Sequence, residues 1–276
     1  MANADTGWPG ELRPEEIAAT RVWLDKRGIE VNEPSRLLSI RIGPRLSRKV
    51  PGRFRWLVGA VVVSILLITA YGIVRDISGV HDRDLPGGVI VYFVCASMQV
   101  ALWLSYLHRE RALGPLPVMD RRSGRPSVFK ILGGWFVASF VITFGGGAVL
   151  AVAMYTTTSA KAYAWSWGGA LGWTALCCAV ILVGTLRRPV YAEDTASAAV
   201  DTELRVLDSQ AAVPGFYPVI VLFDVLFYGQ PAGFTGWLLT YAALSLGTSL
   251  MSVWQHHRRP ALPPGDYGTT ARPRSA

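Results

Sequence analysis

The stretch Val213–Gly233 reads VPGFYPVIVLFDVLFYGQPAG and decides how the C-terminal part of the chain folds. It belongs to the apolar block Ser209–Gln255, which exceeds one membrane span because a helix needs about 20 residues to cross the hydrocarbon. The letters GQPAG, Gly229–Gly233, hold one proline and two glycines and indicate a turn that splits this block. The first half, 212–229, is therefore predicted to be a span of its own, with Asp224 inside it.

The rest of the chain also has the composition of a membrane protein. Of its 276 residues, 51% are hydrophobic and 17% are charged, against about 25% charged residues in soluble domains. Mean hydropathy is +0.32. Further blocks without a charged residue are 56–74, 87–107, 131–160 and 162–186. Because backbone polar groups must bond within a segment that crosses lipid, these blocks are predicted to be helices.

Together the blocks predict an all-α fold, a polytopic transmembrane helix bundle of about six spans. The expected spans are 55–75, 87–107, 131–154, 163–186, 212–229 and 233–255. They make a transmembrane domain, 55–255, between two tails. The tail 1–54 is expected to hold a short amphipathic helix, Arg13–Gly28, followed by a polybasic segment. The tail 256–276 is expected to be disordered.

The basic residues set the expected orientation. Of the 27 Lys and Arg residues, all but Arg75, Arg83 and Lys161 fall on the side that holds both termini. Lys and Arg accumulate on the cytoplasmic side of membrane proteins, so both termini are predicted to be cytoplasmic in a multi-pass plasma-membrane protein. This bias accounts for the net charge of +8, and no nucleic-acid partner is predicted.

Asp224 is the residue that fits its surroundings least. A charge at the centre of a span costs about 2.5–3.5 kcal/mol on insertion scales, so such residues are buried within a bundle or functional. Three interpretations compete. Asp224 is protonated and hydrogen-bonds a neighbouring helix, or it pairs with Lys161 or Arg75, or it lies on an ion, proton or substrate pathway.

Two further groups of residues are assigned roles from their spacing. Small residues four apart let helices approach closely in lipid, so a set of glycines is predicted to pack helices. These are Gly145, Gly146, Gly147, Gly168 and Gly172. The segment before the first span is basic and free of acids, and its side chains are predicted to contact lipid headgroups or merely to fix orientation. These are Arg36, Arg41, Arg45, Arg48, Lys49, Arg53 and Arg55.

The segment after the fourth block carries a recognisable pattern, an Arg-Pro pair, an acidic patch and a D-x-x-L-R-like stretch. Its residues are Arg188, Pro189, Glu193, Asp194, Asp201, Leu204 and Arg205. This pattern resembles a group of uncharacterised multi-spanning membrane proteins from actinobacteria, mainly over 187–229. Where that group often has two adjacent acids, this chain has Asp-Thr-Glu-Leu-Arg. The resemblance implies a six-helix integral membrane protein and transfers no functional residue.

Motifs of catalysis are absent from the sequence, which has no P-loop, HExxH or GxSxG. The cysteines Cys95, Cys177 and Cys178 lie inside spans and form neither a disulfide framework nor a metal-ligand pattern. No metal, cofactor or enzyme activity is therefore expected. An alternative is a lipid-modifying enzyme that uses the outer loop 75–88 with its Asp76, His81, Asp82 and Asp84.

The main functional hypothesis is a transport-related membrane subunit, permease-like or accessory, without a catalytic domain of its own. Its partners would be membrane lipids and a cytoplasmic ATPase. The second hypothesis is a non-catalytic sensor or scaffold that presents its tail to a cytoplasmic regulator. Both rest on topology, which several unrelated functions share.

Overall fold

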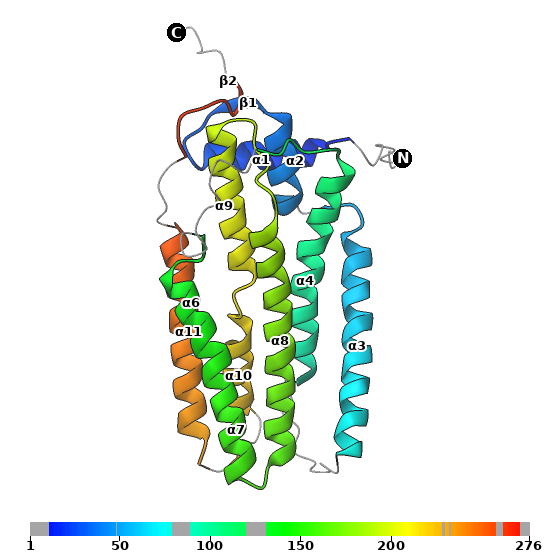
Figure 1. Ribbon diagram of the computed structural model, residues 1–276, viewed down its shortest axis with the longest axis vertical. Helices are drawn as coiled ribbons and strands as arrows, with labels where there is room; N and C mark the ends of the chain where they lie inside the picture. Colours follow the sequence, from blue (N-terminus) through cyan, green and yellow to red (C-terminus); the bar gives the residue numbers. More distant parts are fainter. Residues whose placement is uncertain are drawn as a thin grey trace.

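The computed structural model is a bundle of long helices that carries a smaller head at one end (Figure 1). The structure describes residues 11–47, 49–78, 89–119, 131–227, 230–231, 233–257 and 262–270. Both ends of this described chain lie at the head, so the N-terminal and C-terminal segments meet there.

Six segments in the described chain are long and apolar enough to cross a membrane, which confirms the all-α, six-span bundle. Four are single helices: α3 (Arg53–Ile77), α4 (Val89–Ala112), α8 (Lys161–Arg187) and α11 (Thr235–His257). The third span joins α6 (Gly134–Phe140), the π-helical η1 (Val141–Gly146) and α7 (Gly147–Thr157). The fifth joins α9 (Thr195–Ala211) and α10 (Phe216–Phe227).

The centre of the bundle is an aromatic core between α4, α7, α8, α10 and α11. Its largest members include Tyr92, Tyr163, Trp167 and Tyr217, each no more than 1% exposed. Helix α3 lies at the edge, packed mainly against α4 (Figure 1). Gly184 of α8 lets Trp103 of α4 approach so closely that a Cβ there would lie 2.3 Å from the indole.

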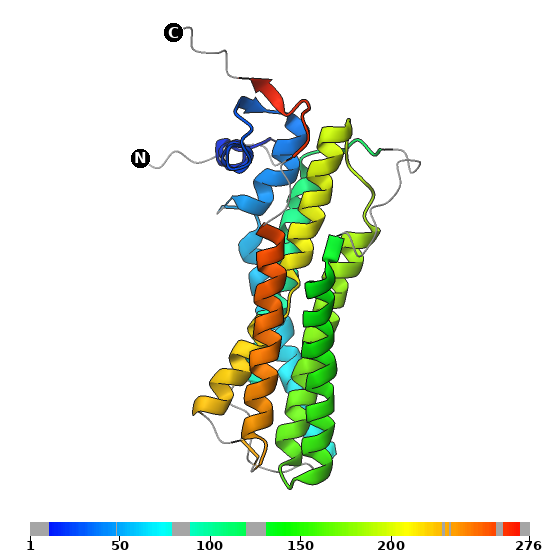
Figure 2. The same ribbon diagram turned by 90° about the vertical axis from the view of Figure 1, so that its left-hand side faces the viewer.

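The fifth span is broken, and the helix that occupies the predicted span 212–229 begins only at Phe216. Helix α9 ends at Ala211 and α10 begins at Phe216. Pro214 has no N–H to donate, and its ring disfavours helical geometry at the preceding Val213, so the chain cannot continue one helix. In Figure 2, α10 is tilted away from the bundle axis while α9 runs along it.

The head is assembled from segments that are distant in the sequence. It contains α1 (Pro14–Asp25), β1 (Val31–Pro34), α2 (Arg36–Leu46), the far part of α9 and β2 (Gly268–Thr270). A small apolar core holds these elements together. It comprises Trp23, Leu24, Val31, Leu38, Ile42, Ala196, Val200, Leu204 and Tyr267.

The two short strands of the head pair antiparallel, with Pro34 opposite Gly268. A side chain at Gly268 would meet the Glu33 carbonyl at 2.1 Å, and its φ of +131° also favours glycine. Tyr267 is buried beside this strand, 5% exposed. The part 262–270 of the C-terminal tail is thus packed against the head, contrary to the expectation of a disordered tail over 256–276.

Candidate functional site

The candidate site is centred on Asp224 of α10. Its side chain is buried, 2% exposed, and its Oδ2 accepts a hydrogen bond of 2.6 Å from the hydroxyl of Tyr163. Tyr163 lies in the first turn of α8, which begins at Lys161 after a tight bend that follows α7. The carboxyl group is therefore held between two spans by a neutral phenol donor, within the part of the bundle predicted to lie in lipid.

Further aromatic side chains build the wall around this bond. The rings of Tyr92 and Tyr217 lie 4.5 Å apart, and Trp167 meets the rings of Tyr217 and Tyr241 edge-on at 5.8 and 5.4 Å. The Tyr217 hydroxyl donates to the Trp167 carbonyl at 3.2 Å. The hydroxyl of Tyr92 and the indole N–H of Trp167 are buried without a hydrogen-bond partner among the described residues. Polar groups thus reach into an otherwise apolar core.

A π-helical turn lies against the same wall. The Tyr241 hydroxyl donates to the Thr143 carbonyl of η1 at 2.8 Å. A Cβ at Gly147 would lie 3.0 Å from Leu171 and 3.1 Å from the Tyr241 hydroxyl, so a glycine is needed for this approach. Single π-helical turns within α-helices occur frequently at functional sites, because they loosen the local hydrogen-bond ladder.

The predicted partners of Asp224 have other contacts. Lys161 Nζ lies 5.8 Å from the centre of the Tyr155 ring, and Arg75 Nε lies 3.9 Å from Asp76 Oδ1. A hydrogen bond to Asp224 comes from Tyr163, a residue that the sequence analysis did not single out. The sequence did contain a hint of this contact, because Tyr163 is a polar residue at the end of a predicted span that lies on the same side of the membrane as Asp224.

The glycines predicted to pack helices fall into two groups. A Cβ added at Gly146 would meet Tyr241, and one added at Gly147 would meet Leu171 and Tyr241, across a helix interface. A Cβ added at Gly145, Gly168 or Gly172 would meet nothing within 4 Å. The spacing of Gly168 and Gly172 therefore leaves open space on α8 in this structure.

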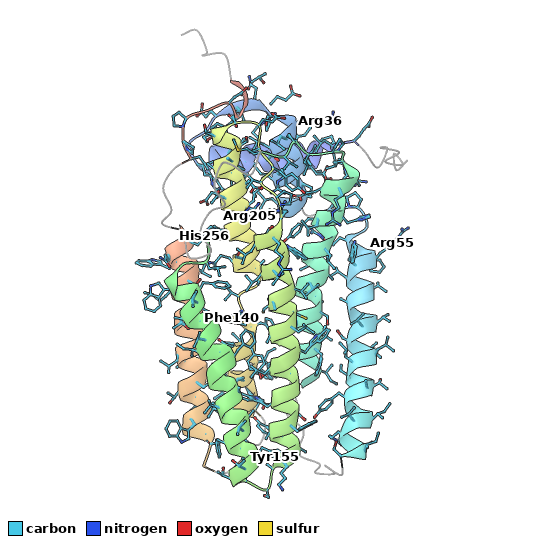
Figure 3. All side chains as sticks on the ribbon, in the orientation of Figure 1. Arg36, Arg55, Phe140, Tyr155, Arg205 and His256 are labelled. Carbon is cyan, nitrogen blue, oxygen red and sulfur yellow. The ribbon has the colours of Figure 1, made fainter. Side chains whose placement is uncertain are left out.

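A second buried polar region, here named the arginine cluster, joins the head to the bundle. It comprises Arg41, Arg45, Glu110, Arg188, Asp201, Arg205 and Asp208. The residue labelled Arg205 in Figure 3 shows where the arginine cluster lies. These residues come from α2, α4, α9 and the loop after α8, so the cluster ties four separate segments together.

Helix α2 contributes the two central cations of the arginine cluster. Arg41 Nη1 lies 3.1 Å from Glu110, and its Nη2 pairs with Asp201. Arg45 binds both oxygens of Asp208, at 2.9 and 3.0 Å, and also pairs with Glu110. Both side chains are 2% exposed. Carboxylates surround Arg45 and raise its pKa despite the opposing effect of burial.

Helix α9 and the end of α8 complete the arginine cluster. Arg205 bonds Asp201 at 2.7 Å and donates to the carbonyls of Thr185, Arg188 and Pro189, which lie at the C-terminal end of α8. Carbonyls there have no partner within the helix, so a guanidinium satisfies them. Arg188, Pro189, Asp201 and Arg205 of the Arg-Pro and D-x-x-L-R pattern thus hold α9 against α8.

The arginine cluster changes the interpretation of the polybasic segment. Arg41 and Arg45 face carboxylates in the protein interior, where they have no access to lipid headgroups. Lys49 is 79% exposed and lies 3.6 Å from Glu15, while Arg36 and Arg55 are exposed. Arg53 is partly buried and donates to the Pro44 carbonyl at 3.4 Å. Arg48 lies outside the described residues.

The outer loop 75–88, considered as the site of a lipid-modifying enzyme, lies partly outside the described chain. His81, Asp82 and Asp84 of the loop 75–88, and Arg83, belong to residues that the structure does not describe. Among the residues that it does describe, no three His, Cys, Asp or Glu side chains are grouped as metal ligands.

Comparison of the chain with protein-family models, with curated proteins and with solved structures found no match in any of the three. The function must therefore be inferred from the site itself.

Proposed function

We propose that this integral membrane protein is a transport-related subunit in which Asp224 carries a proton or binds a cation during the transport cycle. The observation that carries the proposal is the place of Asp224, a buried carboxyl on the short helix α10 just beyond the break in the fifth span. Ionisable residues inside spans are costly and commonly mark ion pathways, proton relays or substrate sites.

Two features of the surroundings support this function. Interrupted spans are common at the substrate and ion sites of transporters, because a break frees backbone groups and lets half-helices move separately. Here the break lies between Ala211 and Phe216, and the π-helical η1 interrupts a second span nearby. Asp224 is closed off from solvent in this conformation, as expected for a carrier site between its two open states.

We place the head in the cytoplasm, because the excess of Lys and Arg lies on that side of the bundle. The cytoplasmic ATPase expected for an accessory subunit would then meet the head. Helix α9 runs from the head to the break before α10, so the head is connected to the helix that carries Asp224 through α9 and the short link 212–215.

A second candidate function is a sensor or scaffold that binds a cytoplasmic regulator. The observation that favours it is the exposed surface of α1, where Val22 is 54% exposed and the Glu15 side chain is 51% exposed. This surface is rigidly held, because Arg109 of α4 bonds Glu16 at 2.9 and 3.0 Å.

The test of the transport function uses the full chain in liposomes that contain a pH-sensitive dye. A potassium diffusion potential is imposed, and proton entry is followed. Wild-type protein is expected to pass protons, and Asp224→Asn is expected to reduce entry to the level of protein-free liposomes. Asp76→Asn is the matched control, because this carboxylate is 69% exposed at the far end of α3 and should leave the flux unchanged.

A pull-down from native membranes in mild detergent, read by mass spectrometry, tests the accessory form of the same function. A stoichiometric ATPase or permease would support it even where the chain alone passes no protons. A regulator lost on deletion of residues 1–28 would favour the second candidate. The absence of both proton flux and a stoichiometric transport partner would contradict the transport proposal.

A further inference from the structure

A long apolar groove runs along one side of the bundle between α3 and α8. It consists of two adjoining hollows of about 780 and 590 Å³, both of which are lined by Trp173 and Leu176 of α8. The larger hollow reaches Tyr155, and the smaller one reaches Arg55. These two residues lie at opposite ends of the bundle in Figure 3, so the groove follows most of the length of the spans.

Glycines explain why the groove is hollow. Gly59 of α3 lines the smaller part, and Gly168 and Gly172 of α8 line the larger part. A Cβ at any of the three would meet nothing within 4 Å. Small residues usually bring helices together in lipid, but here they hold open space at the surface of the bundle. A space facing the hydrocarbon requires an apolar occupant to restore the dispersion contacts of its lining atoms.

The lining of the smaller hollow favours a hydrocarbon chain. Val63, Val100, Leu104 and Val180 are among its walls. Its polar wall residue Ser97 already accepts a hydrogen bond of 3.1 Å from the Trp173 indole. An occupant with many polar groups would find few partners inside this part of the groove.

The mouth of the smaller hollow has a different chemistry. Arg55 and Trp56 line it at the start of α3, next to the head. Arg55 is exposed, and its guanidinium forms no hydrogen bond or ion pair with another described residue. Tryptophan favours the membrane interface, and a basic residue there attracts anionic headgroups. From Arg55 to Val63 the helix rises roughly 12 Å, close to the depth of one leaflet.

We propose that the smaller hollow binds one anionic phospholipid from the head-side leaflet. Its acyl chain would lie against Val63 and Leu104, and its phosphate would meet Arg55. The site is distinct from Asp224 and does not depend on the transport function. The larger hollow lacks a basic residue at its mouth in the described lining, so it carries no such preference for an anionic lipid.

Native mass spectrometry of the full chain in mild detergent tests this site, with phosphatidylglycerol or phosphatidylcholine added in turn. Wild-type protein is expected to retain one phosphatidylglycerol per chain. Gly59→Leu should fill the hollow and abolish retention of this lipid. Gly72→Leu is the matched control on the same helix, because a Cβ there also meets nothing within 4 Å and Gly72 does not line the groove. Val63→Trp provides a second filling variant if Gly59→Leu fails to fold.

Arg55→Gln separates headgroup recognition from filling of the groove. We expect it to weaken phosphatidylglycerol retention about fivefold, the effect of one basic residue at an anionic surface, and to leave phosphatidylcholine unchanged. Arg36→Gln is the control, since Arg36 is exposed on the head, away from the groove (Figure 3). Equal retention by wild type and Gly59→Leu would overturn the proposal. So would a dimer that is lost in Gly59→Leu, because the occupant would then be a second copy.

Discussion

The arginine cluster buries four guanidinium groups among three carboxylates, whereas the membrane core holds Asp224 against the phenol of Tyr163. In the cluster, Arg41 and Arg45 each pair with two carboxylates, so the charged forms stabilise one another. At Asp224, a neutral hydroxyl donates a hydrogen bond to the carboxyl group. A phenol can donate to a carboxylate and can equally accept from a protonated carboxyl group.

The difference indicates which region can change state. The guanidinium groups stay charged at neutral pH, and redundant ion pairs hold the cluster in one arrangement. Asp224 can gain or lose a proton without losing its described hydrogen-bond partner. We therefore interpret the arginine cluster as a fixed joint between head and bundle, and Asp224 as the group that can change its protonation state. The following changes test this contrast.

The largest effect is expected when a central cation of the joint is removed. Arg41→Met leaves Glu110 and Asp201 buried with fewer partners, and breaking a buried pair in this way costs about 3–5 kcal/mol. Unfolding of the detergent-solubilised protein, followed by fluorescence on heating, should show a marked loss of thermal stability. Arg36→Met on the same helix is exposed and should behave like wild type. An unchanged melting temperature for Arg41→Met would show that the joint is not held by these pairs.

A smaller loss is expected when the intramembrane carboxyl is replaced. Asp224→Leu leaves the Tyr163 hydroxyl without its acceptor in an apolar core, at a cost of about 1–3 kcal/mol. Asp224→Asn retains an acceptor oxygen and should give wild-type folded yield, measured by size-exclusion chromatography in detergent. Wild-type yield and thermal stability for Asp224→Leu would contradict a structural contribution from this bond.

The smallest effect on stability is expected when Arg188, the arginine with the weakest ion pairs in the arginine cluster, is replaced. Arg188 Nη1 lies 3.4 Å from Asp208, and its Nε has no hydrogen-bond partner among the described residues. Burial, together with the charges of Arg41 and Arg45, lowers the pKa of Arg188 to about 10.

The sign of the effect follows from proton linkage. The folded state binds fewer protons than the unfolded chain between the lowered pKa of Arg188 and its ordinary value, so stability rises with pH through that window. Below that window, at neutral pH, the charged Arg188 opposes folding. Arg188→Met should therefore leave thermal stability unchanged or raise it by up to about 1 kcal/mol. A loss as large as that of Arg41→Met would show that all members of the cluster contribute alike.

Local patterns predicted the architecture of the bundle well. Charge-free blocks gave six spans within a few residues, apart from the fifth, because the length of an apolar run is set by the thickness of the hydrocarbon. The short helix expected over Arg13–Gly28 corresponds to α1, which the structure places at Pro14–Asp25. The break before α10 coincides with Pro214 and lies at the start of the predicted span 212–229, which did not include a break.

The candidate site was predictable in its centre and not in its surroundings. Asp224 is conspicuous because a carboxylate in an apolar run is costly wherever the run folds. Its partner Tyr163 is 61 residues away, and composition does not distinguish it from the other tyrosines of the spans. The role of Gly168 and Gly172 was likewise undetermined, since the same spacing permits either close packing or an open groove.

By itself the sequence determined that this chain crosses a membrane in six helices, because hydrophobicity acts on each segment separately. Tertiary structure alone decided that Arg41, in a segment that reads as a lipid-binding stretch, pairs with Glu110 and Asp201, 69 and 160 residues away. It also decided that the C-terminal strand pairs with β1. A buried charge is stabilised by whichever opposite charges the fold brings within bonding distance, and that proximity is a property of the whole packed chain.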